Sequence, residues 1–197
     1  MADLLIAVLT MTGCVYGASA AAKLRGRRAY RAYRAGLGEA GLVPARLLPA
    51  TAAVLAAGET AAAAGVIAAA VLTALAGPGA VTVAAVSLGG AALLTAILAA
   101  GVAVIVHRGT KARCACFGAS AGGQAARPLG KAHLARNLGL LIVMAAGLAA
   151  GAVANGRPAP ASVIMAALAG AVAAVLLVRL DDLVAVFTPV PRRSAGR

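Results

Sequence analysis

Five long runs of apolar residues constrain the fold of this chain more than any other feature. Each run is long enough to be considered as a membrane-spanning helix, which needs about 20 apolar residues with a range of about 17–25. The runs are Leu4–Ala22, Leu47–Ala76, Val81–Val106, Leu138–Ala154 and Ala161–Val178. Only 12% of the residues are charged, about half the share of a soluble domain. We therefore predict an all-α, polytopic membrane helical bundle.

The first run resembles a signal peptide in length but differs from one in its charges. A signal peptide carries basic residues before its apolar stretch. Here Asp3 precedes the run, and the basic cluster follows it. We therefore expect Leu4–Ala22 to be a retained first helix, with the N-terminus outside.

The basic residues are concentrated on one predicted side of the membrane. All but one of the 18 lysines and arginines lie in the segments 23–46, 107–136 and 179–197, and the exception is Arg157. With five spans, these three segments share one face. The positive-inside rule then places the N-terminus outside and the C-terminus in the cytoplasm. The net charge of +13 therefore indicates membrane topology, and no nucleic-acid partner is expected.

Glu59 is the only acidic residue inside the five runs. It follows Leu47 by 12 residues, which is about 18 Å along a helix and near the middle of the bilayer. A carboxylate there is costly, so it is expected to be protonated or to face a polar partner or a cavity. Two interpretations stay open: a proton-linked or substrate-facing group, and a structural hydrogen bond within the bundle.

Cys114 and Cys116 lie one residue apart between the third and fourth runs. Thiols at this spacing can form a small, strained disulfide, and strained disulfides are the exchange-active kind. Lys111 and Arg113 would favour the thiolate form. The residues therefore predict a redox pair, with a purely structural C-x-C turn as the alternative.

A metal site would need further ligands, and His107 and His133 are the histidines that flank the cysteine pair. Their spacing matches no usual zinc pattern, so we expect no metal. Cys14 lies alone inside the first run, and we expect it to be a small buried hydrophobic residue.

Three glycine patterns stand out in the chain. Gly13-x-x-x-Gly17 and Gly147-x-x-x-Gly151 are small-residue faces suited to close helix contact, although an Ala- and Gly-rich chain produces such matches by chance. The stretch from Gly36 to Gly41 fits G-x-G-x-x-G. It follows a basic stretch and no strand, so we predict a flexible cytoplasmic turn and no dinucleotide site.

Together the cysteine region and three other segments resemble a known family. The stretch 108-RGTKARCACFGAS-120, followed by Arg136-Asn137 at the head of the next helix, resembles the methylamine utilisation protein MauE family. That family shows R-G, then C-x-C-F-G, then R-N before an apolar helix. The stretches 17-GASAAAKL-24 and 48-LPATAAVLAAGET-60 are similar to its Lys-Leu helix end and to its Leu-Pro with a glutamate. The resemblance runs from about Leu4 to Leu148.

The resemblance implies a four-helix membrane bundle similar to the DoxX-like group, and a redox-associated role. Members are linked to methylamine metabolism and to maturation of the disulfide-rich small subunit of methylamine dehydrogenase. By analogy, Cys114 and Cys116 would be the redox pair. The other positions that match the family are Lys23, Glu59, Phe117, Gly118, Arg136 and Asn137, without an assigned chemistry.

The resemblance and the fifth apolar run, which lies outside it, together suggest an organisation of the chain. We predict a four-helix domain over residues 1–154, an extra transmembrane helix over 155–180, and a basic, disordered cytoplasmic tail over 181–197. The expected location is the plasma membrane. No nucleotide-binding loop, hydrolase triad or haem motif is present, so no cofactor is assigned and enzymatic activity stays open.

The predicted chemistry and the predicted topology disagree. Disulfide maturation of an exported subunit takes place outside the cytoplasm, whereas the charges place Cys114 and Cys116 at the cytoplasmic face. Either the thiols take up reducing equivalents at the inner face, or the loop folds back into the bundle. Two other functions stay open: a non-catalytic membrane assembly factor with a structural C-x-C-F-G turn, and a small transporter that uses Glu59.

Overall fold

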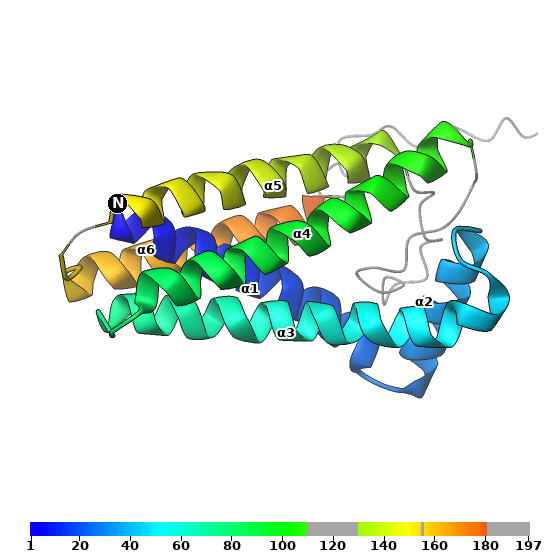
Figure 1. Cartoon of the computed structure of the whole chain (residues 1–197), viewed down its shortest axis with the longest axis horizontal. Coiled ribbons are helices and arrows are strands. Elements are labelled where there is room, and N and C mark those ends of the chain that lie inside the picture. Colours follow the sequence, from blue (N-terminus) through cyan, green and yellow to red (C-terminus); the bar gives the residue numbers. More distant parts are fainter. Residues whose placement is uncertain (110–129, 155, 181–197) are drawn as a thin grey trace, which may run out of the picture.

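The computed structural model describes residues 1–109, 130–154 and 156–180, and this part of the chain is entirely helical between its turns (Figure 1). Five of its helices are long and apolar enough to cross a membrane. The elements are α1 (Ala2–Leu24), α2 (Arg27–Glu39), the 3₁₀ helix η1 (Ala45–Leu47), α3 (Leu48–Ala74), α4 (Ala80–His107), α5 (Lys131–Ala152) and α6 (Pro160–Val178). The all-α class is therefore confirmed for the described residues, and each of the five predicted runs corresponds to a helix that is a candidate membrane span.

Helix α1 is the central element of the bundle. It packs against α3 and α5, and α4 closes the ring by packing against those same two helices. Helix α6 lies along the outside of α1 (Figure 1). In the apolar stretch of α1, 56% of the residues are buried, against 17% in α6. The arrangement is thus a four-helix core with a fifth long helix added to it.

The helix bounds agree closely with the apolar runs except in α5. This helix begins at Lys131, seven residues before the start of the predicted run at Leu138. Its first two turns contain Lys131, His133 and Arg136. A helix can continue past the apolar stretch with polar residues, because its backbone hydrogen bonds are satisfied within the segment. Hydropathy therefore marks the apolar part of such a helix and misses its polar extension.

Helix α2 is an element that the apolar runs do not predict. Residues Gly36 and Gly38, expected in a flexible turn, lie in its last turns, and only Gly41 adopts the left-handed conformation, with φ +65°. That expectation was therefore wrong for the first two glycines. Tyr30, Tyr33 and Leu37 recur at the i, i+3, i+7 spacing of an amphipathic helix, which was the available signal.

Glycines allow the closest contacts around α1. Added Cβ atoms at Gly147 and Gly151 would meet Val8 and Leu5 of α1, so the α5 pattern lies at a helix interface. In the α1 pattern only Gly13 has such a contact, with Val66 and Ile67 of α3, because nothing lies within 4 Å of Gly17. The predicted small-residue faces are therefore half correct in α1 and correct in α5.

The tightest approach involves a glycine that the sequence patterns did not single out. A Cβ on Gly170 of α6 would overlap the carbonyl oxygen of Ala7 and lie 3.1 Å from the backbone nitrogen of Met11. Backbone atoms cannot rotate away as a side-chain end can. Ala166, Gly170 and Ala174 form the buried face of α6, and their spacing of four residues is a small-residue pattern of the same kind.

We predict that Gly170→Ala weakens the docking of α6 on α1. The added methyl group overpacks a backbone contact, at a cost of about 1–3 kcal/mol. Thermal unfolding of the purified protein in detergent should show a lower midpoint. The matched control is Gly90→Ala in α4, where nothing lies within 4 Å of the added Cβ. Equal midpoints for the two variants would contradict the α1–α6 contact.

Candidate functional site

A buried pair of opposite charges forms the most polar site inside the described bundle. Lys23 lies in the last turn of α1 and Glu59 lies in the middle of α3. Their side chains come from helices that pack directly against each other. Only 1% of Lys23 and 3% of Glu59 is exposed. Two residues that the family resemblance marked without a chemistry are thus brought into contact.

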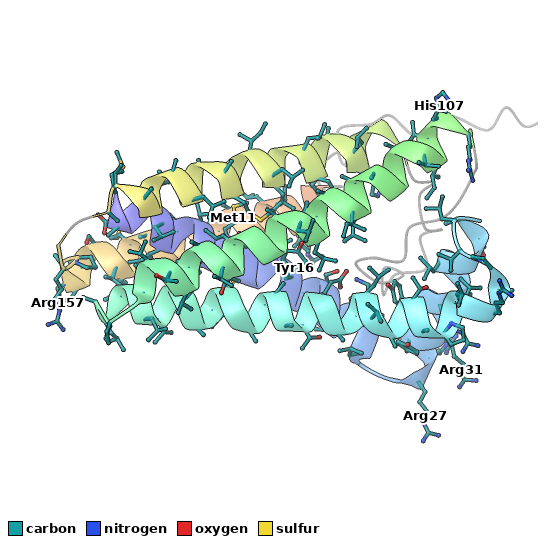
Figure 2. All side chains as sticks on the ribbon, viewed as in Figure 1. Met11, Tyr16, Arg27, Arg31, His107 and Arg157 are labelled. Atoms are coloured by element: carbon teal, nitrogen blue, oxygen red, sulfur yellow. The ribbon has the colours of Figure 1, made fainter. Side chains whose placement is uncertain are left out.

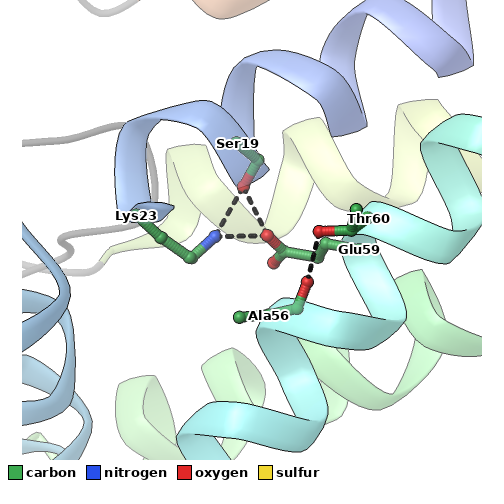
Figure 3. A network of polar contacts seen from close by, with 5 residues as sticks. All are labelled: Ser19, Lys23, Ala56, Glu59 and Thr60. Carbon is green, nitrogen blue, oxygen red and sulfur yellow. Dashed lines mark hydrogen bonds and ion pairs between the residues drawn. The ribbon is translucent and has the colours of Figure 1, made fainter. Parts of the chain in front are cut away.

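The two charged groups and one hydroxyl form a closed triangle (Figure 3). The Lys23 ammonium lies 2.5 Å from Glu59 Oε2 and donates to Ser19 Oγ at 2.6 Å. The Ser19 hydroxyl donates in turn to the same carboxylate oxygen at 3.0 Å. Ser19 and Lys23 are four residues apart and so lie on one face of α1. Every member of the triangle therefore has a polar partner.

Helix α2 contributes an aromatic ring to this site. Tyr33 is buried, with 7% of it exposed, and the centre of its ring lies 5.1 Å from the Lys23 ammonium. A cation at this distance from an aromatic face is attracted by the ring quadrupole. Lys23 consequently contacts groups from α1, α2 and α3, and the aromatic ring from α2 lies against the charged pair.

The position of Glu59 along α3 brings it to the end of α1. Its oxygen is in contact with the last turn of α1, because α3 extends well past the end of α1 toward α2 (Figure 1). The expected polar partner is present, and it is Lys23.

A second polar contact lies further along the same face of α1. The Tyr16 hydroxyl lies 2.7 Å from Thr95 Oγ1 and 2.9 Å from the carbonyl oxygen of Ala91, both in α4. Tyr16 precedes Ser19 by three residues, so the two polar groups point from neighbouring turns. This face of α1 is therefore linked by hydrogen bonds to both α3 and α4. The sequence had indicated a polar partner for Glu59 and gave no sign of the link to α4.

Four of the sequence-predicted site residues lie outside the described residues: Cys114, Cys116, Phe117 and Gly118. The helices that flank them end and begin at the same end of the bundle as α2 (Figure 1). Arg136 and Asn137 are half-buried in the second turn of α5.

Cys14 and the two histidines do not form a site in the described chain. Cys14 is exposed on α1, so the expectation of a buried residue was wrong. His107 is exposed and His133 is half-buried, and no group of three or more potential metal ligands occurs in residues 1–109, 130–154 and 156–180.

The comparisons with known proteins decide the family. The family model described as methylamine utilisation protein MauE matches residues 1–150. The chain belongs to the MauE family. The match contains α1 to α4, most of α5 and the Lys23–Glu59 site, whereas α6 lies beyond it. No curated protein and no solved structure matches the chain. It is thus a MauE-family multi-pass membrane protein linked to methylamine utilisation.

We predict strong energetic coupling between Lys23 and Glu59. Removing one partner leaves the other charge buried and unpaired, which costs about 3–5 kcal/mol. Lys23→Met and Glu59→Met should each lower the thermal midpoint markedly in detergent. The double variant should be closer to the wild type than the sum of the single losses, because an apolar pair replaces the ion pair.

The matched control for this cycle is Thr60→Val, next to Glu59. Thr60 is exposed and its hydroxyl donates to Ala56 of its own helix, so its loss should have little effect. Strictly additive losses for Lys23→Met and Glu59→Met would contradict the coupling.

Proposed function

We propose that this MauE-family protein is a membrane thiol–disulfide exchange protein with Cys114 and Cys116 as its reactive pair. The observation that carries the proposal is the C-x-C-F-G stretch within the residues that the family model matches. A disulfide across one intervening residue is strained and therefore readily exchanged. Lys111 and Arg113 stabilise the attacking or leaving thiolate.

The exchange uses one protein dithiol as the electron donor and one protein disulfide as the acceptor. A thiolate of a reduced donor protein attacks one sulfur of the Cys114–Cys116 disulfide, that S–S bond breaks, and a mixed disulfide forms. The second donor thiolate breaks the mixed disulfide, so the donor leaves oxidised and the pair holds two electrons as two thiols. A disulfide-containing client takes these electrons by the reverse sequence, and its wrongly paired disulfide is opened.

The described bundle supports this role by its arrangement at one end. Helix α4 ends and helix α5 begins at the end of the bundle where α2 lies (Figure 1). Ile105 in the last turns of α4 packs with Ala40 and Leu42 from the α2–η1 connection. Tyr33 of α2 lies against the Lys23–Glu59 pair. The ends of α2, α3 and α4 therefore form a connected support from which the cysteine segment leaves.

The same end carries most of the described positive charge. Arg27 and Arg31 project from this end of the molecule and Arg157 from the opposite end (Figure 2). By the positive-inside rule, this distribution favours a cytoplasmic position for α2. The N-terminus then lies on the outer side of the plasma membrane and the C-terminus on its cytoplasmic side. The reactive pair then works at the inner face, where its donor is a cytoplasmic dithiol protein and it takes up reducing equivalents.

The exchange proposal predicts a trapped partner. Cys116→Ser leaves a mixed disulfide at Cys114 that cannot be resolved within the pair, so a larger species should appear on non-reducing gels and yield the partner by mass spectrometry. The double variant Cys114→Ser/Cys116→Ser should lose at least about tenfold in methylamine-dependent growth rate, because both exchange steps are blocked.

Cys14→Ser is the matched control, since Cys14 is exposed on α1 away from the helix ends. It should keep full function. Full growth of the double cysteine variant would overturn the exchange proposal and favour the assembly factor with a structural C-x-C-F-G turn.

The proposed topology predicts the side of the thiols. A membrane-impermeant maleimide should label Cys114 and Cys116 in inverted vesicles and leave them unlabelled in intact cells. Cys14→Ser removes the only other thiol, so the signal then reports the pair alone. Labelling in intact cells would contradict the proposed topology and indicate the opposite orientation.

One observation favours the transporter as a second candidate. The sequence offered Glu59 without another charged group in the spans, and the structure supplies Lys23 as its buried partner. Paired charges inside a bundle mark ion or proton pathways in many transporters. This candidate requires that Glu59→Gln abolishes substrate flux in vesicles while the cysteine variants leave it unchanged.

A further inference from the structure

An apolar groove lies on the outside of the bundle where α1 ends and α3 passes beneath α2. It has a volume of about 560 Å³ and is lined by Leu24, Tyr30 and the face of α3 that carries Ala53, Ala57, Ala61 and Ala64. The four alanines are exposed. From Ala53 to Ala64 the groove extends about 16 Å along α3 at the rise of an α-helix. Its shape and lining suit one extended hydrocarbon chain.

A second hollow adjoins the groove and has a different chemistry. It measures about 530 Å³ and shares Leu24 and Tyr30 with the groove, but its remaining lining is Gly26, Arg27 and Arg31. Both arginines are exposed, and both extend outward from α2 (Figure 2). One continuous surface therefore changes from apolar to basic at Tyr30.

The positive charges of the two arginines repel each other, and a bound anion would remove this repulsion. They are four residues apart on one helix face, where like charges destabilise a helix. The Arg31 Nε donates to the carbonyl oxygen of Arg27 at 3.3 Å, which keeps the guanidinium near its neighbour. In the described part of the chain, neither arginine has a carboxylate partner. The hollow is therefore complementary to a negatively charged group.

We propose that this surface binds an anionic phospholipid. The phosphate lies between Arg27 and Arg31, and one acyl chain lies along the alanine face of α3. A basic amphipathic helix beside membrane spans is suited to the headgroup layer, and the proposed cytoplasmic position of α2 places it at the leaflet that carries anionic lipids. A soluble anion would use the arginines alone, whereas a phospholipid uses both the basic hollow and the apolar groove.

The bound lipid would also act on the buried site. Tyr30 lines both hollows, and its ring lies 6.3 Å from that of Tyr33, which contacts Lys23. A lipid in this position therefore holds α2 against the end of α1. This binding site is independent of the thiol chemistry, so either proposal can fail without the other.

The test uses the full-length chain, delipidated in detergent and titrated with phosphatidylglycerol or phosphatidylcholine. Native mass spectrometry then counts the bound lipids. We expect phosphatidylglycerol to bind at least about tenfold more tightly, and Arg27→Gln/Arg31→Gln to remove about that factor, since each basic residue contributes at an anionic surface. Arg157→Gln, at the opposite end, is the matched charge control and should bind as the wild type does.

The groove is tested separately by filling it. Ala57→Leu should weaken phosphatidylglycerol binding, whereas Ala68→Leu, an exposed position of α3 outside the groove, should not. Inorganic phosphate should compete poorly. No preference for phosphatidylglycerol, no effect of the arginine variant, or no effect of Ala57→Leu would overturn the proposal. Efficient competition by inorganic phosphate would also overturn it, and would leave a simple anion site.

Discussion

The buried ion pair between Lys23 and Glu59 is the constraint on which this end of the molecule depends. Neither charge can be left alone inside an apolar bundle, because an unpaired buried charge loses its hydration without compensation. The two helices that carry them must therefore keep one relative position along their axes. Tyr33 adds α2 to the same arrangement, so a single polar contact orders three elements.

The rest of the bundle is held by helix packing, which constrains the helix positions less specifically than the ion pair does. Lipid offers apolar surroundings as favourable as a neighbouring leucine, so close approach of small residues and interhelical hydrogen bonds decide which faces meet. Gly147 and Gly170 bring α5 and α6 onto α1, and Tyr16 ties α1 to α4. Helix α1 is central because it carries both kinds of contact on several faces.

The buried ion pair and the helix packing position the helices that flank the proposed reactive cysteines. Helix α2, whose Tyr33 contacts Lys23, lies at the end where α4 ends and α5 begins (Figure 1), and the C-x-C-F-G stretch belongs to the connection between α4 and α5. A reactive pair of thiols needs a support that does not move when a partner binds and leaves. The proposed lipid site would strengthen that support from outside, by holding α2 at the membrane surface.

The all-α class and the five candidate spans follow from the amino-acid sequence alone, because long apolar runs have one stable solution in a bilayer. The sequence also identified Lys23 and Glu59 individually, through the family resemblance. That Lys23 and Glu59 are partners is visible only in the folded bundle, since residues 36 positions apart meet through helix packing that no local period encodes. The same holds for Gly170 against Ala7, for the exposed position of Cys14, and for the groove beneath α2. Each depends on which helix faces meet, and the sequence of a uniformly apolar helix gives little indication of which face is buried.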